Sequence, residues 1–287
     1  AARVVPACPH YGTCGGCALQ HLAPAAQLAF KQAQLMENLA RLGGVEPGRV
    51  LEPLTGPVWG YRRRARLGVK HVARKGRVLV GFRERSAPFV ADLHECRVLA
   101  PPADRLIDPL AALVGELSIA ARVPQVEVAV AGSDCALVLR VLDPPTAADL
   151  DRLRSFEHAE SVRVYLQPGG PATVAPLTPN LEPLRYELGH FGLAIEFEPI
   201  DFIQVNATLN EAMVARALET LELEPASHVL DLFCGLGNFS LPMARSAGEV
   251  VGVEGDAGLV ARAERNARSQ GVANAAETAA TLSPLLA

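Results

Sequence analysis

The sequence lacks any apolar run near the roughly 18 residues that a membrane-spanning helix requires, so we expect no membrane partner. It also lacks the apolar segment of a secretory signal peptide, and it contains no internal repeat or low-complexity segment. Without an export signal, its six cysteines are more typical of intracellular thiols or metal ligands than of disulfides. We therefore expect a cytoplasmic protein. Because the chain does not begin with Met, we also expect it to have been trimmed.

The composition describes a globular protein with unevenly distributed charge. The chain has 287 residues, 49% hydrophobic and 20% charged, which is enough for two domains with separate cores. Its net charge is −4, yet residues 61–85 contain ten Lys or Arg and a single acid, Glu84. This contrast predicts a face that binds a polyanion on an otherwise acidic body.

Three cysteines near the N-terminus have the spacing of a metal site. Cys8, Cys14 and Cys17 follow the pattern C-x5-C-x2-C, with glycines that let the chain wrap around a metal. A fourth soft ligand is needed, and the candidate is Cys96, which a proline-containing turn follows. Four cysteines can hold Zn²⁺ or an iron–sulfur cluster, and their spacing does not distinguish the two.

Residues 59–85 alternate as a β-hairpin does. Arg62, Arg64 and Arg66 share one face, and the turn lies at residues 74–77. A charge run is often only a solvated face. Here, however, aromatic residues lie among the cations, and such rings suit stacking on unpaired bases: Trp59, Tyr61 and Phe82. The segment therefore favours binding of a nucleic acid.

The segment from Val229 to Glu254 has the pattern of a βαβ unit. An apolar strand ends at Phe233, a glycine loop follows over residues 234–238, and a helix is expected over residues 239–246. A second strand ends in Glu254, an acid placed to accept hydrogen bonds from a ribose diol. S-adenosylmethionine and NAD both satisfy this geometry.

Two residues favour S-adenosylmethionine over NAD. Ser240 stands where a dinucleotide fingerprint needs its third glycine. Asp231, just before the loop, can hold a cationic group such as the methyl sulfonium. Beyond Glu254 a helix is predicted over residues 258–270, but no further strand in residues 271–287, so we expect an incomplete domain.

Four motifs, taken in order, resemble the RNA uracil-C5 methyltransferases and among them the bacterial 23S rRNA branch. They are CPHYGTCGGC at residues 8–17, YRRRAR at residues 61–66, FIQVN at residues 202–206 and DLFCGLGNF at residues 231–239. The resemblance implies an α/β enzyme. A central α+β domain for an iron–sulfur cluster and RNA would be joined to an incomplete Rossmann-like, S-adenosylmethionine-dependent methyltransferase domain.

The resemblance also implies the ligands and the residues that bind them. A [4Fe–4S] cluster is expected on Cys8, Cys14, Cys17 and Cys96. S-adenosylmethionine is expected on Gln204, Phe233, Asn238 and Glu254. The expected partner, 23S ribosomal RNA, would contact Tyr61, Arg62, Arg63, Arg64, Arg66 and Arg83. We expect a monomer.

The expected organisation has four parts. A cysteine loop at residues 1–19 belongs to the central domain, and residues 20–50 form a helix that packs on the methyltransferase domain. Residues 51–200 form the central RNA-binding domain, and residues 201–287 form the first part of the methyltransferase domain.

The sequence departs from the family at the reacting groups. In the family, a cysteine thiolate of a Ser-Cys-Asn-Pro motif adds to C6 of a flipped-out uracil, and C5 then attacks the methyl group. The 287 residues contain neither that motif nor the base that removes the C5 proton, and the family's N-terminal β-barrel is missing as well. Cys234 lies inside the glycine loop and suits backbone packing. We therefore expect no activity from this chain and identify no catalytic residue.

Two other functions remain open. An iron–sulfur RNA-binding module without catalysis is consistent with the central domain. A Rossmann-type oxidoreductase is consistent with the glycine loop, although Ser240 argues against it.

Overall fold

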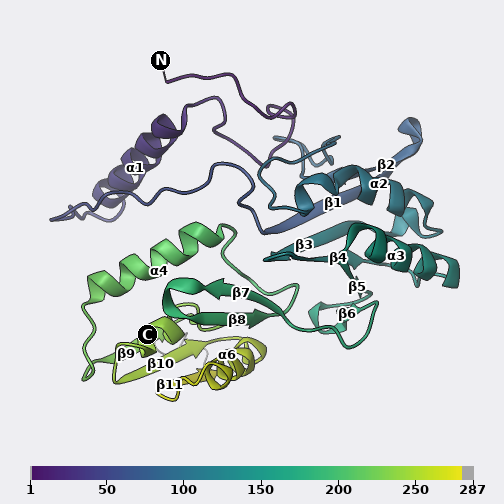
Figure 1. Cartoon of the computed structure of the whole chain (residues 1–287). Coiled ribbons are helices and arrows are strands. Elements are labelled where there is room, and N and C mark those ends of the chain that lie inside the picture. Colours follow the sequence, from purple (N-terminus) through teal and green to yellow (C-terminus); the bar gives the residue numbers. More distant parts are fainter. Residues whose placement is uncertain (1, 280–287) are drawn as a thin grey trace.

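The middle of the chain forms a mixed β-sheet, here called the central sheet. The computed structural model describes residues 2–279, and within them the central sheet has six strands in the order β2-β1-β3-β4-β5-β6 (Figure 1). β4 and β5 run parallel, and the other neighbouring strands run antiparallel. The strands are β1 (Arg64–Val72), β2 (Arg77–Gly81), β3 (Gln125–Ala131), β4 (Asp134–Arg140), β5 (Arg163–Gln167) and β6 (Ala175–Pro176).

Two helices cover one face of the central sheet. α2 (Ile107–Glu116) packs on β2, and α3 (Ala147–Glu160) packs on β5 and provides the crossover between the parallel strands. Their side chains share one hydrophobic cluster with the sheet, in which Leu110, Leu139 and Leu153 are almost completely buried. Residues of the other face, such as Ala136 and Val138, are buried in a second hydrophobic cluster. Both faces are therefore covered, which explains why the strands carry long apolar runs rather than strict alternation.

The predicted hairpin of residues 59–85 is confirmed. β1 pairs with β2 in antiparallel register, and the short 3-10 helix η1 (Ala73–Lys75) joins them, with Gly76 in the left-handed region at a φ of 64°. Along β1 the buried Ala65, Leu67 and Val69 alternate with half-buried or exposed residues, of which Arg66 and Lys70 are exposed cations, because successive side chains of a strand point to opposite faces. The other 3-10 helices are η2 (Ala103–Arg105), η3 (Ala120–Arg122), η4 (Pro171–Thr173) and η5 (Gly189–Phe191).

The N-terminal segment combines an irregular cysteine loop with one helix. The predicted helix is α1 (Pro24–Arg41), which has Pro24 in its first turn and lies apart from the central sheet (Figure 1). The structure describes the whole of this helix, and none of its residues is buried. The segment that follows it runs along α4 (Ala207–Leu221), where Glu52 O accepts a hydrogen bond from Arg216. Packing of the helix itself on a methyltransferase domain stays a prediction.

The C-terminal part contains a second, parallel sheet, here called the C-terminal sheet. Within the described residues its strand order is β11-β10-β9, and α6 packs on β10 and β11. The elements are β7 (Leu184–Leu188), β8 (Leu193–Phe197), α4 (Ala207–Leu221), β9 (His228–Leu232), α5 (Ser240–Ala244), β10 (Glu249–Glu254), α6 (Ala257–Ser269) and β11 (Ala275–Ala279). No helix within residues 2–279 has the length and apolar character needed to cross a membrane.

Two expectations for this part are wrong. β11 is a third strand in a segment where none was predicted, because pairing with β10 rather than a local apolar pattern defines it. Helix α5 has five residues instead of the eight expected, since the chain from Gly235 to Phe239 still belongs to the loop. Residues 280–287 of the predicted strandless tail lie outside the described part of the chain.

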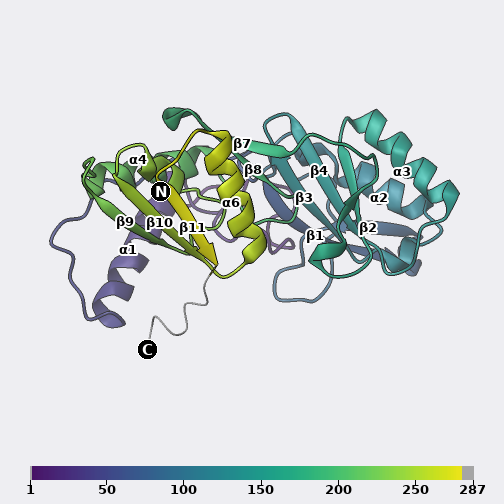
Figure 2. The same ribbon diagram turned by 90° about the horizontal axis from the view of Figure 1, so that it is seen from below.

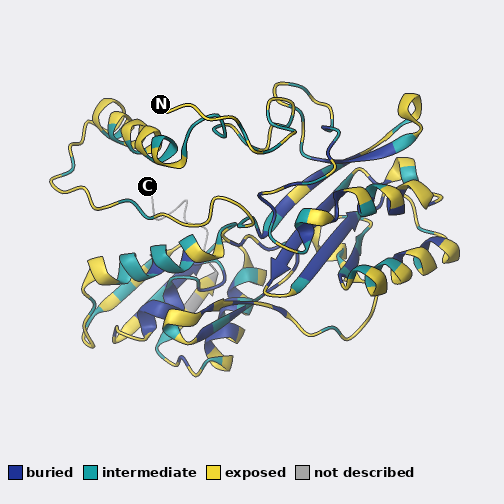
Figure 3. Ribbon diagram, turned by 45° about the horizontal axis from the view of Figure 1, so that its top comes forward, coloured by how far each residue is buried: buried dark blue, intermediate teal, exposed yellow. Residues whose placement is uncertain are grey.

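The β7–β8 hairpin lies between the two sheets (Figures 1 and 2). A second hydrophobic cluster joins residues of the central sheet such as Val138, hairpin residues such as Leu188 and Ile195, and C-terminal residues such as Leu241 and Val250. The hairpin belongs by sequence to the predicted central domain, yet it shares this core with the segment that carries the glycine loop. Figure 3 shows that buried residues are concentrated in the strands of the central sheet and of the hairpin, whereas the residues of α1 are half-buried or exposed.

Candidate functional site

The glycine loop turns sharply at the carboxyl end of β9. Phe233 has a φ of 64°, uncommon for a residue with a side chain, and its N–H donates to Val253 O at 2.7 Å. Gly237 has a φ of 87°, and a Cβ there would lie 2.9 Å from Leu241 Cγ. The loop is therefore held against β10, while the Phe233 side chain is largely exposed.

Glu254 ends β10 beside this loop, as the sequence predicts. Its Oε2 accepts a hydrogen bond from the Gly235 N–H at 3.1 Å, and its Oε1 accepts one from the Gly255 N–H at 2.7 Å. The carboxylate thus bridges the glycine loop and the turn that leads into α6. Oε1 also accepts a hydrogen bond from the Asp256 N–H at 3.2 Å. A carboxylate can accept about four hydrogen bonds, so Glu254 retains capacity for one more from a ligand hydroxyl.

Asn238 is anchored by two buried residues from other elements. Its Oδ1 accepts hydrogen bonds from Tyr186 Oη at 2.9 Å and from Asn210 Nδ2 at 2.8 Å. Its Nδ2 donates to Asn210 Oδ1 at 3.0 Å, which makes a reciprocal amide pair. Tyr186 lies on β7 and Asn210 on α4, and both are at least 95% buried. Sequence reasoning missed them, because no motif marks a polar residue that becomes buried only through tertiary packing.

Ser240, which replaces the third glycine of a dinucleotide loop, binds the acid that precedes the loop. Its Oγ donates to Asp231 Oδ2 at 2.6 Å, and Ser240 is completely buried. Burial raises the pKa of Asp231, although hydrogen bonds from Ser240 oppose the rise. The serine therefore has a structural partner that a glycine could not provide, and it holds a half-buried carboxyl group next to the loop.

Gln204 reaches the region from the segment between β8 and α4. Its side chain is exposed, and its carbonyl oxygen accepts a hydrogen bond from Arg63 Nε at 2.7 Å. Two residues later, Asn206 caps α4 by accepting a hydrogen bond from the Leu209 N–H. The segment thereby leads directly into the helix that anchors Asn238 through Asn210. The four predicted cofactor residues thus come from three separate stretches of chain.

Asn266 on α6 is a further residue that sequence reasoning did not assign. It is completely buried, and its amide both accepts from the Glu196 N–H and donates to Glu196 O and to Leu236 O. One side chain therefore joins α6, strand β8 and the glycine loop. Its position near the end of an Ala- and Arg-rich helix carried no signal of this role.

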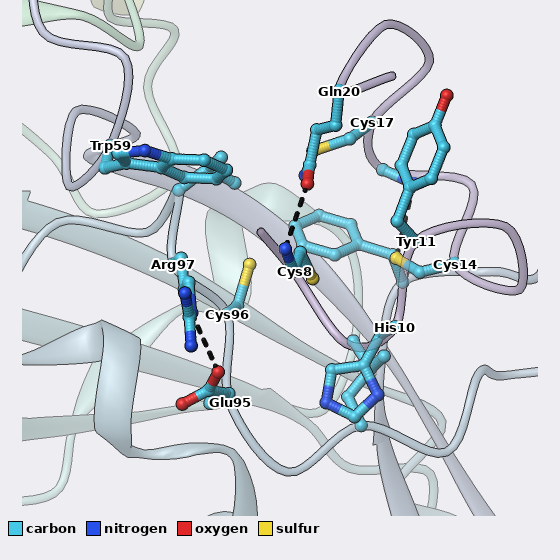
Figure 4. Close-up of a pocket in the computed structure, with 14 residues that line it drawn as sticks. Cys8, His10, Tyr11, Cys14, Cys17, Gln20, Trp59, Glu95, Cys96 and Arg97 are labelled. Atoms are coloured by element: carbon cyan, nitrogen blue, oxygen red, sulfur yellow. Dashed lines mark hydrogen bonds and ion pairs between the residues drawn. The ribbon is translucent and has the colours of Figure 1, made fainter. Parts of the chain in front are cut away.

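The four predicted cluster ligands line a single pocket (Figure 4). Three come from the N-terminal loop and one from the segment after β2, and Trp59 and Tyr11 lie on opposite sides of the pocket in this view. The loop is tied to the end of the hairpin, because the Gly15 N–H donates to Arg83 O and the Arg85 N–H donates to Thr13 O, both at 2.8 Å. The pocket residues include Cys8, Cys14, Cys17, Cys96, Trp59 and Phe82.

Four thiols line this pocket, beside other polar side chains such as those of His10 and Glu95, and thiols are the groups that iron–sulfur clusters require. Burial raises the pKa of Cys14, and it raises the pKa of Cys96 to about 11. The neighbouring cysteines add to both shifts. Across residues 2–279, no three His, Cys, Asp or Glu side chains lie close enough to one another to hold a single metal ion. The four cysteines thus fit a sulfur-bound cluster in composition and share one pocket, but their placement does not form a closed metal site.

The basic segment offers fewer free cations than its sequence predicts. Arg64 forms an ion pair with Glu127 at 2.5 Å and its side chain is 14% exposed, and Arg63 is 5% exposed. Arg66 also binds Glu127, but its side chain is 68% exposed, and Arg83 is exposed as well. Arg63 and Arg64 are thus held within the protein, whereas the sequence predicts that they contact RNA. RNA contact stays a prediction for all six residues, with Arg66 and Arg83 best placed for it.

Comparison with known proteins agrees with this geometry. The family model for tRNA (uracil-5-)-methyltransferase matches residues 192–280. The 23S rRNA (uracil(1939)-C(5))-methyltransferase RlmD of Alkalilimnicola ehrlichii is 54% identical over 95% of the chain and 61% of the relative, and that of Cupriavidus necator is 50% identical over 96% and 63%. The chain therefore spans about three fifths of the length of these curated relatives.

A solved structure shares the fold along nearly the whole chain. The Pyrococcus abyssi tRNA (uracil-54, C5)-methyltransferase, in complex with S-adenosyl-L-homocysteine, superposes with a TM-score of 0.70 over 98% of this chain and 66% of its own, at 21% identity. The glycine loop, the acid that ends β10 and the relatives at 50% identity or more lead to one conclusion. This chain belongs to the RNA uracil-C5 methyltransferase family.

Proposed function

We propose that this chain carries the S-adenosylmethionine-binding and RNA-binding parts of an enzyme that methylates C5 of a uracil in 23S ribosomal RNA. The observation that carries the proposal is the position of Glu254 at the carboxyl end of β10, hydrogen-bonded to the glycine loop. Nucleoside cofactors bind at this edge of parallel sheets. The curated relatives, which are named for this reaction, support the choice of substrate.

Each predicted cofactor residue has a distinct task in this proposal. When bound, S-adenosylmethionine supplies the methyl group. Glu254 accepts hydrogen bonds from the ribose hydroxyls, Asn238 donates an amide N–H to the cofactor, and the exposed Phe233 ring packs against it. Asp231 lies near enough to the loop to favour a cationic ligand. Gln204 approaches from the segment before α4.

The central region in this proposal holds a [4Fe–4S] cluster and binds the RNA. The four cysteines that line one pocket support the cluster, with Zn²⁺ as the alternative ligand. Arg66, Arg83 and the half-buried Tyr61 would contact the RNA backbone and unpaired bases. We propose a monomer that acts in the cytoplasm, where ribosomal RNA is found.

Cofactor binding is tested by calorimetric titration with S-adenosylhomocysteine. Glu254→Gln removes the charged acceptor and should weaken binding at least tenfold, since a hydrogen bond to a charged group contributes about 1.5–3 kcal/mol. Glu249→Gln, at the other end of β10, is the matched control and should bind as the parent chain does. Failure of the parent chain to bind S-adenosylhomocysteine, or tighter binding of NAD, would overturn the proposal.

The reaction itself needs a nucleophile that these 287 residues do not contain in the family's Ser-Cys-Asn-Pro context. We therefore predict cofactor binding without turnover for this chain. An assay that follows transfer of a labelled methyl group to unmodified 23S rRNA checks this prediction. Measurable turnover would show that the nucleophile lies elsewhere in the chain.

The second candidate is an iron–sulfur RNA-binding module without catalysis. It is favoured by the basic hairpin and the cysteine pocket, which are joined through the Gly15–Arg83 and Arg85–Thr13 hydrogen bonds. This function predicts RNA affinity that falls steeply with salt concentration. RNA binding without S-adenosylhomocysteine binding would favour the module over the methyltransferase.

A further inference from the structure

Arg63 is a buried arginine that lies between the central sheet and the segment that precedes α4. It is 5% exposed, although its neighbours in sequence form the basic segment. Its N–H donates to Val205 O at 2.9 Å, and its carbonyl oxygen accepts from the Val130 N–H at 2.7 Å. Arg63, which directly precedes β1, is therefore hydrogen-bonded on one side to β3 and on the other to the segment that contains Gln204.

The guanidinium of Arg63 faces the cofactor region rather than solvent. Its Nε donates to Gln204 O at 2.7 Å, and its central carbon lies 4.4 Å from the centroid of the Tyr186 ring. Burial lowers the pKa of Arg63, but an arginine remains charged well above neutral pH. A buried cation over an aromatic ring is strongly attracted to it, so Arg63 and Tyr186 restrict each other's positions.

Tyr186 connects Arg63 to the glycine loop through a hydrogen bond to Asn238. Its hydroxyl donates to Asn238 Oδ1, which also accepts from Asn210, so both acceptor sites of that oxygen are used. One N–H of the Asn238 amide donates to Asn210. Among the hydrogen bonds of the described residues, this leaves the second N–H of Asn238 to meet a ligand.

We propose that Arg63 is a positioning residue for the cofactor site and not an RNA ligand. Arg63 holds Gln204 through its backbone and Asn238 through Tyr186, so that the Asn238 amide presents one N–H donor to an acceptor group of the bound cofactor. This inference rests on the proposed function, because the ligand is the cofactor named there. It also gives the basic segment a direct physical connection to the glycine loop.

The test uses three variants of the full chain. Arg63→Met keeps much of the side-chain length without the charge, and Tyr186→Phe keeps the ring but removes the hydroxyl. Arg66→Met is the matched control, because Arg66 is exposed on the same stretch of chain. Three quantities are measured: hydrogen exchange of the ligand-free protein, affinity for S-adenosylhomocysteine, and affinity for an rRNA fragment as a function of salt.

Positioning by Arg63 predicts one pattern. Arg63→Met and Tyr186→Phe should speed hydrogen exchange in residues 233–240, Arg63→Met should also speed it in residues 202–210, and both should weaken S-adenosylhomocysteine binding about tenfold or more. Neither should change the salt dependence of RNA binding. Arg66→Met should leave exchange and cofactor affinity unchanged and lower the salt slope by about one.

The opposite pattern would overturn the proposal. If Arg63→Met lowered the salt slope of RNA binding and left exchange and cofactor affinity as in the parent, Arg63 would be an RNA ligand. If Arg63→Met did not fold, Tyr186→Phe would decide, since unchanged exchange in residues 233–240 contradicts the connection. If the parent chain bound no S-adenosylhomocysteine, the proposed function would fail, while the exchange data would still decide the role of Arg63.

Discussion

The central sheet and the C-terminal sheet differ in how completely their strands are covered. In β4 of the central sheet, five consecutive residues are buried, and Leu139 is fully so. In β9 of the C-terminal sheet, Leu230 is 61% exposed and Leu232 is 41% exposed. Two strands of similar apolar sequence therefore have different surroundings. The central sheet is stabilised by its own core, whereas the ordered loop beside β9 depends on contacts with other elements.

Those contacts are polar and specific. Tyr186, Asn210 and Asn266 hold the glycine loop through hydrogen bonds from β7, α4 and α6. Buried polar groups are costly unless they are paired, so each of these side chains also fixes where its partner lies. Apolar packing thus determines the shape of the central region, and a small hydrogen-bonded network determines the shape of the glycine loop.

The largest expected effect concerns the metal dependence of the central region. If the proposed cluster is present, Cys96→Ser should reduce iron and sulfide content from near stoichiometric to near background, because one of the four proposed thiolate ligands is lost. Hydrogen exchange should then rise in residues 8–17 and 83–85 but not in β9 to β11. The control is Cys135→Ala, since Cys135 is a core residue whose pKa is raised by burial to about 12. Iron loss in the control, or full iron in Cys96→Ser, would contradict the assignment.

The next effect compares equivalent truncations in the two sheets. Leu139→Ala should lower the free energy of unfolding by about 2–5 kcal/mol, because it leaves a cavity in a closed core. Leu230→Ala should change it by about 0.5 kcal/mol or less, because the side chain is largely exposed. Chemical denaturation of both variants measures the difference. Equal losses in the free energy of unfolding for the two variants would mean that the Leu230 side chain of β9 is covered in solution.

A third effect tests how much the hydrogen bonds of Asp149, at the start of α3, contribute to the stability of the central region. Asp149 caps α3 together with Thr146, and it also accepts hydrogen bonds from the Ser118 N–H and Oγ. Burial alone would raise the pKa of Asp149, but the hydrogen bonds from Ser118 and Thr146 outweigh it and hold the pKa below its ordinary value. Asp149→Asn should cost about 1.5–3 kcal/mol at neutral pH.

The pH dependence of this residue follows from the direction of the shift. A lowered pKa means that Asp149 stabilises the fold at pH values above about 4, the ordinary pKa of an aspartate, and that this contribution is lost as the pH falls further. Denaturation between pH 3 and pH 7, approximate limits around that pKa, should therefore show a shallower acid loss for Asp149→Asn than for the parent chain. If the free energies of unfolding of Asp149→Asn and of the parent chain fell equally with falling pH, the role assigned to the Asp149 carboxylate would be wrong.

The smallest effect concerns the glycine loop. Gly237→Ala should cost about 1–2 kcal/mol for its left-handed backbone, and more because the new methyl group meets the fully buried Leu241. Gly235→Ala carries the backbone cost alone, since no atom lies within 4 Å of the position that its Cβ would take. Thermal unfolding of the two variants ranks these costs. A larger loss for Gly235→Ala would mean that the loop has a different shape in solution.

Much of the candidate site could be predicted from local patterns. The cysteine spacing marked three of the cysteines that line the pocket, and the strand–glycine loop–strand pattern placed Glu254 beside the loop. The alternation of residues 59–85 predicted the hairpin and its turn. These features depend on neighbours in sequence, where strand period and turn chemistry act.

The rest could not be predicted, because it depends on partners far apart in the chain. β11 is a strand only through its pairing with β10, and Arg63 points inward only because Tyr186 and Gln204 lie there. Arg64 is covered because β3 brings Glu127 next to it. Nothing in the local pattern of a basic strand distinguishes an arginine that meets solvent from one that meets a buried ring.

The sequence by itself determined which chemical groups this protein has: soft thiols at metal-ligand spacing, a glycine loop followed by an acid, and a cationic hairpin. Only the tertiary structure decided which of these groups face a ligand and which face the protein. The physical reason is that backbone conformation follows local propensity, whereas a buried polar side chain is tolerated only where the fold supplies its hydrogen-bond partner.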